Sequence, residues 1–276
     1  DVYKRQIYKL SRKHTTREVF MSKLSKIALL AVAIFGITSS ANAATAILAT
    51  NDFVGISFWL VSMGCLAATA FFFLERGSVA PAWRVSITVA GLVTGIAFIH
   101  YMYMREVWIG TGESPTVYRY IDWLITVPLL MLEFYFVLAA VKKVPSSVFW
   151  KLLIGSIVML VGGYLGEAGY VQPFMGFVVG MAGWIYILFE IFSGEAGQLA
   201  AKGGNKSLST AFSAMRIIVT IGWAVYPLGY IFGYLLGGVD ANSLNVIYNA
   251  ADFLNKIAFG LIIWAAAMQN TRVARS

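Results

Sequence analysis

Seven hydrophobic stretches divide most of the chain, and each is long enough to cross a lipid bilayer as a helix. They cover about residues 53–74, 84–104, 117–140, 147–166, 173–193, 210–237 and 245–269. A spanning helix needs about 20 predominantly apolar residues, whereas a barrel strand needs about half that number and alternates in polarity. No such alternation is found in these stretches. The sequence therefore predicts an all-α membrane protein, a seven-transmembrane-helix bundle whose first partner is the lipid bilayer.

The overall composition supports a membrane protein and excludes several other classes. Hydrophobic residues make up 59% of the chain and charged residues 12%, about half the charged fraction of a soluble domain. Most of the net charge of +8 comes from residues 1–43, which hold eight of the 21 basic residues and two of the 13 acidic ones. The remainder carries only +2, so we expect no nucleic-acid partner. The single cysteine, Cys65, leaves no disulfide framework or zinc site, and we expect no metal.

The N-terminal region has the pattern of a secretory signal peptide. From Met21 the chain reads MSKLSKIALLAVAIFGITSSANA, a short basic region, an apolar core and a small-residue end at Ala43. We therefore expect residues 1–20 to be an upstream extension, residues 21–43 to be removed, and residues 44–276 to form one membrane domain. The alternative is an uncleaved N-terminal anchor. Mass spectrometry of the mature N-terminus would separate the two.

The distribution of basic residues predicts how the seven helices are oriented. A cleaved signal peptide places the N-terminus outside, and seven spans then place the C-terminus inside. Ten basic residues fall on the predicted inner side and one, Arg105, on the outer side, which is a clear positive-inside bias. The ten are Arg76, Arg84, Lys142, Lys143, Lys151, Lys202, Lys206, Arg216, Arg272 and Arg275. We expect a multi-pass protein of the bacterial inner membrane with a periplasmic N-terminus and a cytoplasmic C-terminus.

Two ionisable residues lie near the middle of the last stretch, NVIYNAADFLNKIAFGLIIWAAAMQ. Asp252 and Lys256 are four residues apart and therefore share one face of a helix. An ionisable residue at membrane depth is energetically costly and by default marks a functional site. A lysine in such a place serves either as one half of an ion pair or as a Schiff-base amine.

The third stretch carries three further ionisable residues. They are Arg119, Asp122 and Glu133. Arg119, Asp122 and the hydroxyl residue Thr126 are spaced three and four residues apart and lie on one helical face, with Glu133 seven residues beyond Thr126. Asp122 and Glu133 are separated by roughly 16 Å along the helix axis. Two carboxyl groups at different depths, with a hydroxyl group between them, are typical of a proton path.

Two alternatives remain open for these polar residues. His100, near the outer end of the second stretch, lies at about the depth of Asp122 and could tune its protonation, or it could be satisfied by backbone groups. Asp252 with Lys256, and Arg119 with Asp122, could be two ion pairs that only lock helices together. The second alternative leaves the deeper carboxyl group of the third stretch without a basic partner.

Aromatic residues gather around the same positions. Trp123 is adjacent to Asp122, Tyr248 lies two turns before the lysine, and the sixth stretch contains Trp223 and Tyr226 followed by Pro227. Aromatic residues at helical spacing pack more often than they bind a ligand, and a proline in a span usually marks a kink. Spacing alone therefore does not decide between packing and binding.

Three long segments resemble the microbial rhodopsins, and among them the proteorhodopsins. They are GLVTGIAFIHYMYMREVW, SPTVYRYIDWLITVPLL and YNAADFLNKIAFGLIIW, and the resemblance covers nearly all of residues 50–270. The resemblance implies seven helices around all-trans retinal. It also implies a light-driven ion transporter and not an enzyme.

The resemblance implies a role for each buried ionisable residue. Lys256 would carry retinal through a protonated Schiff base. Asp122 would be the principal counterion and primary proton acceptor, Asp252 the second counterion, and Arg119 would act on the acceptor's charge. Glu133 would be the cytoplasmic proton donor.

The resemblance also implies which ion is transported and which colour of light is absorbed. The triplet Asp122, Thr126 and Glu133 matches outward proton pumps, whereas related chloride pumps place asparagine at the first position. His100 matches the histidine that pairs with the acceptor in proteorhodopsins, and Leu130 matches a position where leucine accompanies green absorption. The residues expected to line the chromophore are Trp123, Leu130, Trp184, Trp223, Tyr226, Pro227 and Tyr248.

The sequence thus predicts a light-driven outward proton pump whose partners are protons and lipid. Two other functions stay open: a light sensor using the same chromophore, and a non-photoactive seven-span transporter in which Lys256 is an ion-pair partner. The resemblance further implies a homo-oligomer, a pentamer or a hexamer, without an obligatory protein partner.

Overall fold

A computed structural model describes residues 47–202 and 204–273 of the chain. The expected extension (residues 1–20) and signal peptide (residues 21–43) lie outside the described residues. Within these ranges all regular structure is helical. The elements are α2 (Phe53–Glu75), η2 (Pro81–Trp83), α3 (Arg84–Thr111), α4 (Thr116–Ala139), α5 (Ser146–Glu167), α6 (Pro173–Phe192), α7 (Glu195–Ala201), α8 (Lys206–Ile217), η3 (Ile218–Gly222), α9 (Val225–Tyr230), η4 (Ile231–Leu235) and α10 (Ala241–Val273).

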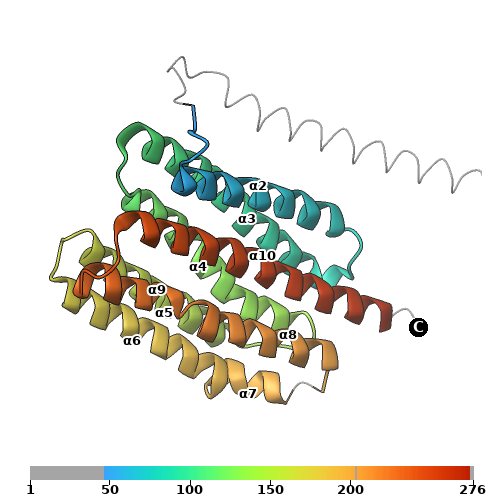
Figure 1. Ribbon diagram of the computed structural model, residues 1–276. Coiled ribbons are helices and arrows are strands. Elements are labelled where there is room, and N and C mark those ends of the chain that lie inside the picture. The colour runs from blue at the N-terminus through green and yellow to red at the C-terminus, as the bar shows by residue number, and fades with distance from the viewer. Residues whose placement is uncertain (1–46, 203, 274–276) are drawn as a thin grey trace, which may run out of the picture. The chain divides into compact units, whose positions relative to one another are not determined.

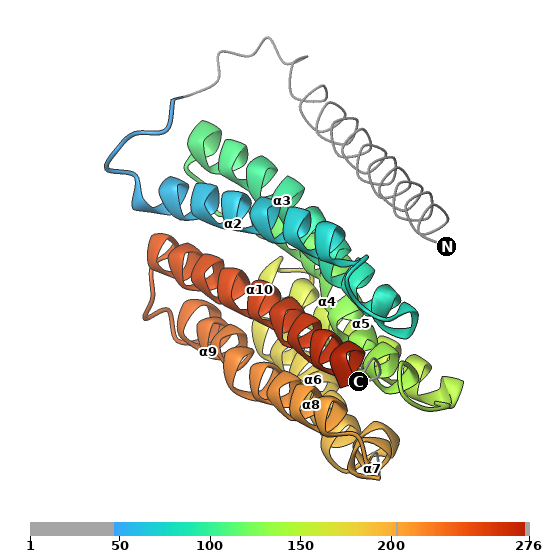
Figure 2. The same ribbon diagram turned by 90° about the vertical axis from the view of Figure 1, so that its right-hand side faces the viewer.

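The seven predicted spans are confirmed. Within the described residues, seven helical segments are long and apolar enough to cross a membrane. Neighbours along the chain pack together from α2 to α6, and α10 packs against both α2 and the α8–α9 segment, which closes the ring. Figures 1 and 2 show these helices lying side by side with α10 next to α2.

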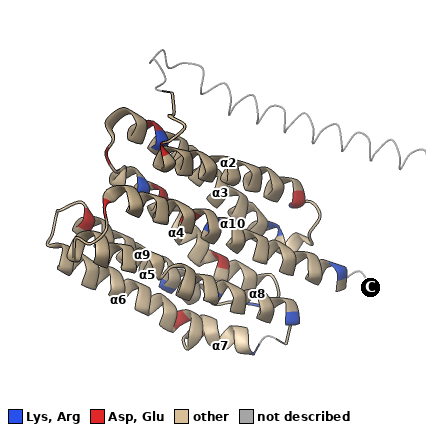
Figure 3. Ribbon diagram, viewed as in Figure 1, with Lys and Arg blue, Asp and Glu red and all other residues tan. Residues whose placement is uncertain are grey.

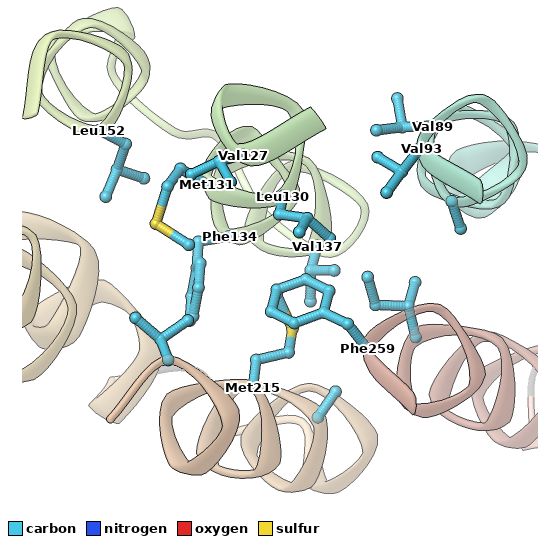
Figure 4. Close-up of a cluster of buried hydrophobic side chains, with 14 of the residues drawn as sticks. Val89, Val93, Val127, Leu130, Met131, Phe134, Val137, Leu152, Met215 and Phe259 are labelled. Carbon is cyan, nitrogen blue, oxygen red and sulfur yellow. The ribbon is translucent and has the colours of Figure 1, made fainter. Parts of the chain in front are cut away.

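Large apolar side chains fill the bundle between the helices (Figure 4). Phe134 of α4 meets Phe212 of α8 and Phe259 of α10 edge to face, with ring centroids 4.9 and 5.9 Å apart. Met215 and Val137 complete the contact and are fully buried. This cluster lies beyond Lys256 toward the C-terminal end of α10 and makes the interior apolar there.

The sixth span departs from the single continuous helix that its hydrophobicity suggests. It consists of α8, the π-helical turn η3, α9 and a second π-helical turn, η4. In η3 the Trp223 amide donates to the carbonyl of Ile218, five residues back, at 2.9 Å. Pro227 has no N–H to donate. The Tyr226 amide donates to the Trp223 carbonyl at 3.1 Å, and the Asn255 side chain of α10 donates to the Gly222 carbonyl at 3.1 Å. The proline thus accompanies a widened turn, a feature often found at functional sites.

Glycines allow α5 and α6 to approach at backbone distance. A Cβ atom added to Gly176 would lie 2.6 Å from the Gly166 Cα and 2.7 Å from its nitrogen, and one added to Gly162 would lie 2.7 Å from the Gly180 nitrogen. Small residues are the usual means of close helix packing in membranes, where no hydrophobic force pulls helices together.

We expect Gly176→Ala to destabilise the protein by about 1–3 kcal/mol, because the two backbones must separate to make room for the methyl group. Thermal loss of the helical circular dichroism signal in detergent measures the effect. Gly110→Ala in α3 is the matched control, since a Cβ atom there meets nothing within 4 Å. Equal melting of both variants would contradict the tight packing.

Candidate functional site

The amine of Lys256 lies in the middle of the bundle between two carboxylates. Its side chain, on α10, is only 3% exposed. The Nζ atom makes a short hydrogen-bonded ion pair with Asp122 of α4 and a second ion pair, 3.1 Å long, with Asp252 one turn earlier on α10. One buried cation therefore faces two buried anions, an arrangement that loses its compensation when the cation is removed.

Asp252 is held by donors from three other helices. It accepts hydrogen bonds from the Tyr101 hydroxyl at 2.7 Å, the Tyr226 hydroxyl at 2.5 Å and the Trp123 indole at 3.0 Å. Hydrogen bonds to a carboxylate favour its charged form. These donors hold Asp252 in position and favour its charged form.

Asp122 is held much less completely. Its Oδ1 atom has no hydrogen-bond partner among the described residues, although it is buried. The Thr126 hydroxyl, one turn further along α4, donates to the Asp122 main-chain carbonyl at 2.9 Å and not to the carboxylate. Of the two carboxylates at the amine, Asp122 is the one with an unpaired oxygen that can receive a proton.

Arg119 is held by polar groups other than the two carboxylates. It donates to the Tyr101 hydroxyl at 3.1 Å and to the side-chain oxygens of Asn245 and Asn249, each at 2.9 Å. Within residues 47–202 and 204–273 no ion pair joins Arg119 to an acidic residue, so the idea of a helix-locking pair with Asp122 is wrong. Arg119 is linked to Asp252 through Tyr101, whose hydroxyl accepts from Arg119 and donates to Asp252.

The two asparagines were not foreseen, although the sequence carries their signal. Asn245, Asn249, Asp252 and Lys256 are spaced four, three and four residues apart, which places them on one face of α10. A polar stripe of this kind in an apolar helix predicts a shared network. Arg119 is the group that the two asparagines hold.

His100 of α3 is only partly buried. In the described part of the chain no hydrogen bond links it to Asp122. The expected pairing of His100 with the acceptor stays a prediction.

Glu133 lies at the opposite end of the site. It is 1% exposed, and neither carboxyl oxygen has a hydrogen-bond partner within the described residues. Phe134, the next residue along α4, belongs to the apolar cluster of Figure 4. Figure 3 shows many charged residues near helix ends and fewer within the bundle. An unpaired carboxyl group in apolar surroundings is more stable neutral than charged.

A cavity of about 110 Å³ opens beside the amine, several times the roughly 10–15 Å³ that one water needs. Its wall includes six of the seven expected residues: Trp123, Leu130, Trp184, Trp223, Tyr226 and Pro227. Tyr248 is not part of that wall, because it packs behind Trp123 and Tyr226, with ring centroids 5.7 and 5.8 Å away. Glu167, which the sequence did not single out, does line the cavity.

Comparison with known proteins places the chain in a family. Residues 52–270 match the family model described as bacteriorhodopsin-like protein. The chain belongs to this family. It is 55% identical to the blue-light absorbing proteorhodopsin of the gamma-proteobacterium Hot 75m4, over 80% of the chain and 88% of that relative.

Two further comparisons agree with this membership. The chain is 54% identical to the green-light absorbing proteorhodopsin of the gamma-proteobacterium EBAC31A08, over 80% of the chain and 89% of that relative. The crystal structure of the blue light-absorbing proteorhodopsin from Med12 superposes with a TM-score of 0.70 at 53% identity, covering 79% of this chain and all of the other. The microbial rhodopsin fold expected from the sequence is thereby confirmed.

Proposed function

We propose that this bacteriorhodopsin-like protein is a light-driven outward proton pump that uses all-trans retinal bound to Lys256. The observation that carries the proposal is the asymmetry around the amine. On the Arg119 side lies Asp122, a carboxylate with an unpaired oxygen. On the other side lies Glu133, a single buried carboxyl group in apolar surroundings. A proton that leaves the lysine nitrogen thus has an acceptor on one side and a donor on the other.

The wall of the cavity beside Lys256 suits a conjugated apolar molecule. Its wall is built largely of indole, phenol and aliphatic groups, and Lys256 supplies the one amine among the lining residues. Retinal, joined to this amine as a protonated Schiff base, supplies light absorption and a change of shape. Trp123, Trp184 and Trp223 would hold the molecule in place.

The three buried acidic residues have different parts in the proton transfer. Asp122 and Asp252 together balance the cation at the Lys256 nitrogen. Asp252 keeps its charge, because three hydroxyl and indole donors stabilise it, and Asp122 accepts the proton at its unpaired Oδ1. Glu133, neutral at rest, returns a proton to the nitrogen and is refilled from its own side of the membrane.

The orientation follows from the basic residues. The ends near Arg76, Lys142, Lys202 and Arg272 would face the cytoplasm, which puts Glu133 on the inner side and Arg119 on the outer side. The N-terminus would then be periplasmic and the C-terminus cytoplasmic, in the inner membrane of a bacterium. We also propose that copies of the chain assemble as a pentamer or hexamer.

Illumination of retinal-fed cells in unbuffered medium tests the proposal. We expect the medium to acidify in the light and the change to vanish with a protonophore. Colour without acidification, together with a photocycle far slower than milliseconds, would favour a light sensor. Colourless cells would leave a non-photoactive transporter.

Replacing Glu133 with glutamine is expected to slow recovery of the resting state while leaving the first proton transfer unchanged. The amide fills the same space but cannot donate a proton. We expect the late decay to slow by about 10²-fold, the lower range for a positioned acid. Flash photolysis measures the decay. Glu106→Gln, on the exposed end of α3, is the control, and an unchanged late decay in Glu133→Gln would remove its donor role.

A further inference from the structure

Asn255 is a buried polar residue in the cavity wall for which the proposed proton transfers have no use. It directly precedes Lys256 on α10 and is 7% exposed. A buried amide group is costly unless it is hydrogen-bonded. The partners of Asn255 lie across the bundle, in the sixth span.

The side chain of Asn255 bonds to the widened turn of that span. It donates to the carbonyl of Gly222, the last residue of η3, at 3.1 Å. In a regular α-helix this carbonyl would accept from the Tyr226 amide, but that amide donates to the Trp223 carbonyl at 3.1 Å. Asn255 thus supplies the donor that a regular helix would have supplied. Only glycine fits at position 222, because a Cβ atom there would overlap the Asn255 side chain.

A second side chain bonds to the same turn from α6. The indole N–H of Trp184 donates to the carbonyl of Val219, within η3, at 3.0 Å. The turn is therefore bonded through its main chain to both neighbouring helices, α6 and α10. We refer to these two bonds, Trp184–Val219 and Asn255–Gly222, as the turn clamp.

The form of η3 decides which residues of the sixth span face the cavity. An α-helix turns by about 100° per residue, and a π-helical turn holds about one residue more than an α-helical turn. If η3 became a regular α-helix, the residues after it would rotate by about 100° relative to α8. Trp223 and Tyr226 come after it, and both line the cavity. The Tyr226 hydroxyl also donates to Asp252 at 2.5 Å, so a change of form would remove two wall residues and one donor to the counterion.

Several other buried polar side chains have a simpler role. The Ser62 hydroxyl donates to the Phe58 carbonyl at 2.9 Å, and the Thr94 hydroxyl donates to the Ala90 carbonyl at 3.0 Å, each four residues back in its own helix. Such bonds satisfy the side chain and fix nothing outside the helix. The turn clamp differs, because its acceptors are main-chain carbonyls of another helix at the point where that helix is irregular.

We propose that Asn255 is a positioning residue: its bond to Gly222 holds η3 in the widened form. The widened turn in its place keeps Trp223 and Tyr226 in the wall of the chromophore cavity, and Trp184 supports the same turn from α6. The inference deepens the proposed function and rests on it, because the cavity is taken to hold retinal. Loss of either donor should loosen the wall around the lysine nitrogen.

Hydrogen exchange of the retinal-free protein tests the turn clamp without any chromophore. Asn255→Leu keeps the approximate size of the side chain and removes the donor. We expect the amides of residues 218–226 to exchange about two- to tenfold faster in this variant, the change in a local opening equilibrium when one buried hydrogen bond is lost. Trp184→Phe keeps an aromatic ring and removes the indole N–H, so it should act in the same direction. Mass spectrometry of the peptides that cover these residues measures the rates.

The matched control loses a buried hydrogen bond elsewhere. Thr69→Val breaks the contact between the hydroxyls of Thr69 on α2 and Thr94 on α3, which are 2.8 Å apart and do not line the cavity. It should lower the melting temperature about as much as Asn255→Leu does. It should leave the exchange of residues 218–226 at the wild-type rate, which separates a general loss of stability from release of the turn.

The retinal-loaded protein tests the positioning of the wall. Hydroxylamine added in the dark cleaves a Schiff base that it can reach, so the rate at which the visible band disappears reports how tightly the wall encloses the lysine nitrogen. We expect Asn255→Leu to bleach about two- to tenfold faster than wild type, in proportion to the open fraction. Gly222→Ala should also bleach faster, because its methyl group displaces the Asn255 amide. Thr69→Val should bleach at the wild-type rate.

Two results would overturn the inference. Wild-type exchange of residues 218–226 in both Asn255→Leu and Trp184→Phe would mean that the two bonds do not hold the turn, and Trp184→Phe gives this answer even where Asn255→Leu folds poorly. Faster exchange with wild-type bleaching would mean that the turn does not position the wall. Failure of the proposed function looks different: wild-type protein would form no visible band, while the exchange rates of the retinal-free variants would still support or contradict the turn clamp.

Discussion

Replacing Lys256 with alanine is expected to abolish the visible absorption band that the wild-type protein develops with all-trans retinal. A covalent link to an aldehyde needs a primary amine inside the cavity, and Lys256 provides the one amine in the cavity wall. Retinal could still enter the apolar space, but it would absorb as a free polyene in the near ultraviolet. Absorption spectra before and after adding retinal measure the outcome.

The same substitution should also weaken the fold. Without the lysine, Asp122 and Asp252 lie buried beside each other with no cation between them. Removing one partner of a buried ion pair costs about 3–5 kcal/mol. Part of that cost disappears when one carboxyl group binds a proton, so the variant should become more stable as the pH falls.

Two variants separate lost chemistry from lost folding. Lys256→Arg keeps a positive charge for both carboxylates but has no amine that forms a Schiff base, so it should fold and stay colourless. Lys202→Ala removes an exposed lysine near the end of α7 and should leave the band intact. A visible band in Lys256→Arg would refute the proposed attachment site.

Hydrophobicity alone predicted four of the seven spans to within one residue at each end. The stretches 53–74, 117–140, 147–166 and 173–193 correspond to α2, α4, α5 and α6. The second and last spans run further than expected, to Thr111 and from Ala241 to Val273. Hydropathy marks only the part of a helix that lies in lipid, whereas hydrogen bonding carries the helix on into the polar zone.

Other features depend on contacts between distant residues and leave no local signal. The π-helical turn of η3 places the Gly222 carbonyl where Asn255, 33 residues later, can donate to it. Glu167 sits at the end of an apolar run, where a charge usually faces the headgroups. It lines the cavity together with residues of α4, α6, α9 and α10, and only the assembled bundle brings these helices together.

Replacing Asp122 with asparagine is expected to shift the visible band to longer wavelength and to stop outward pumping. A carboxylate beside the nitrogen stabilises the positive charge where it resides in the ground state. Excitation moves that charge away from the nitrogen, so loss of the carboxylate narrows the energy gap. Asparagine keeps the size of the side chain and removes both the charge and the ability to take a proton.

The hydrogen bonds around the amine make Asp122 a better proton acceptor than Asp252. Asp252 accepts three bonds besides that of Lys256, and a proton placed on it would have to displace one of these donors. Asp122 has a free oxygen, so it loses no donor when it binds the proton. In Asp122→Asn, Asp252 should therefore remain a counterion, and the variant should keep a coloured but inactive chromophore.

The measurement pairs an absorption spectrum with light-driven acidification of cells or vesicles. Glu106→Gln controls for the loss of an acidic residue that lies outside the site, and it should change neither readout. Restored pumping in Asp122→Glu would show that a titratable group is needed there and not the aspartate's shape. Pumping by Asp122→Asn at the wild-type rate would mean that Asp252 accepts the proton in spite of its three donors, and the division of roles between the two carboxylates would have to be reversed.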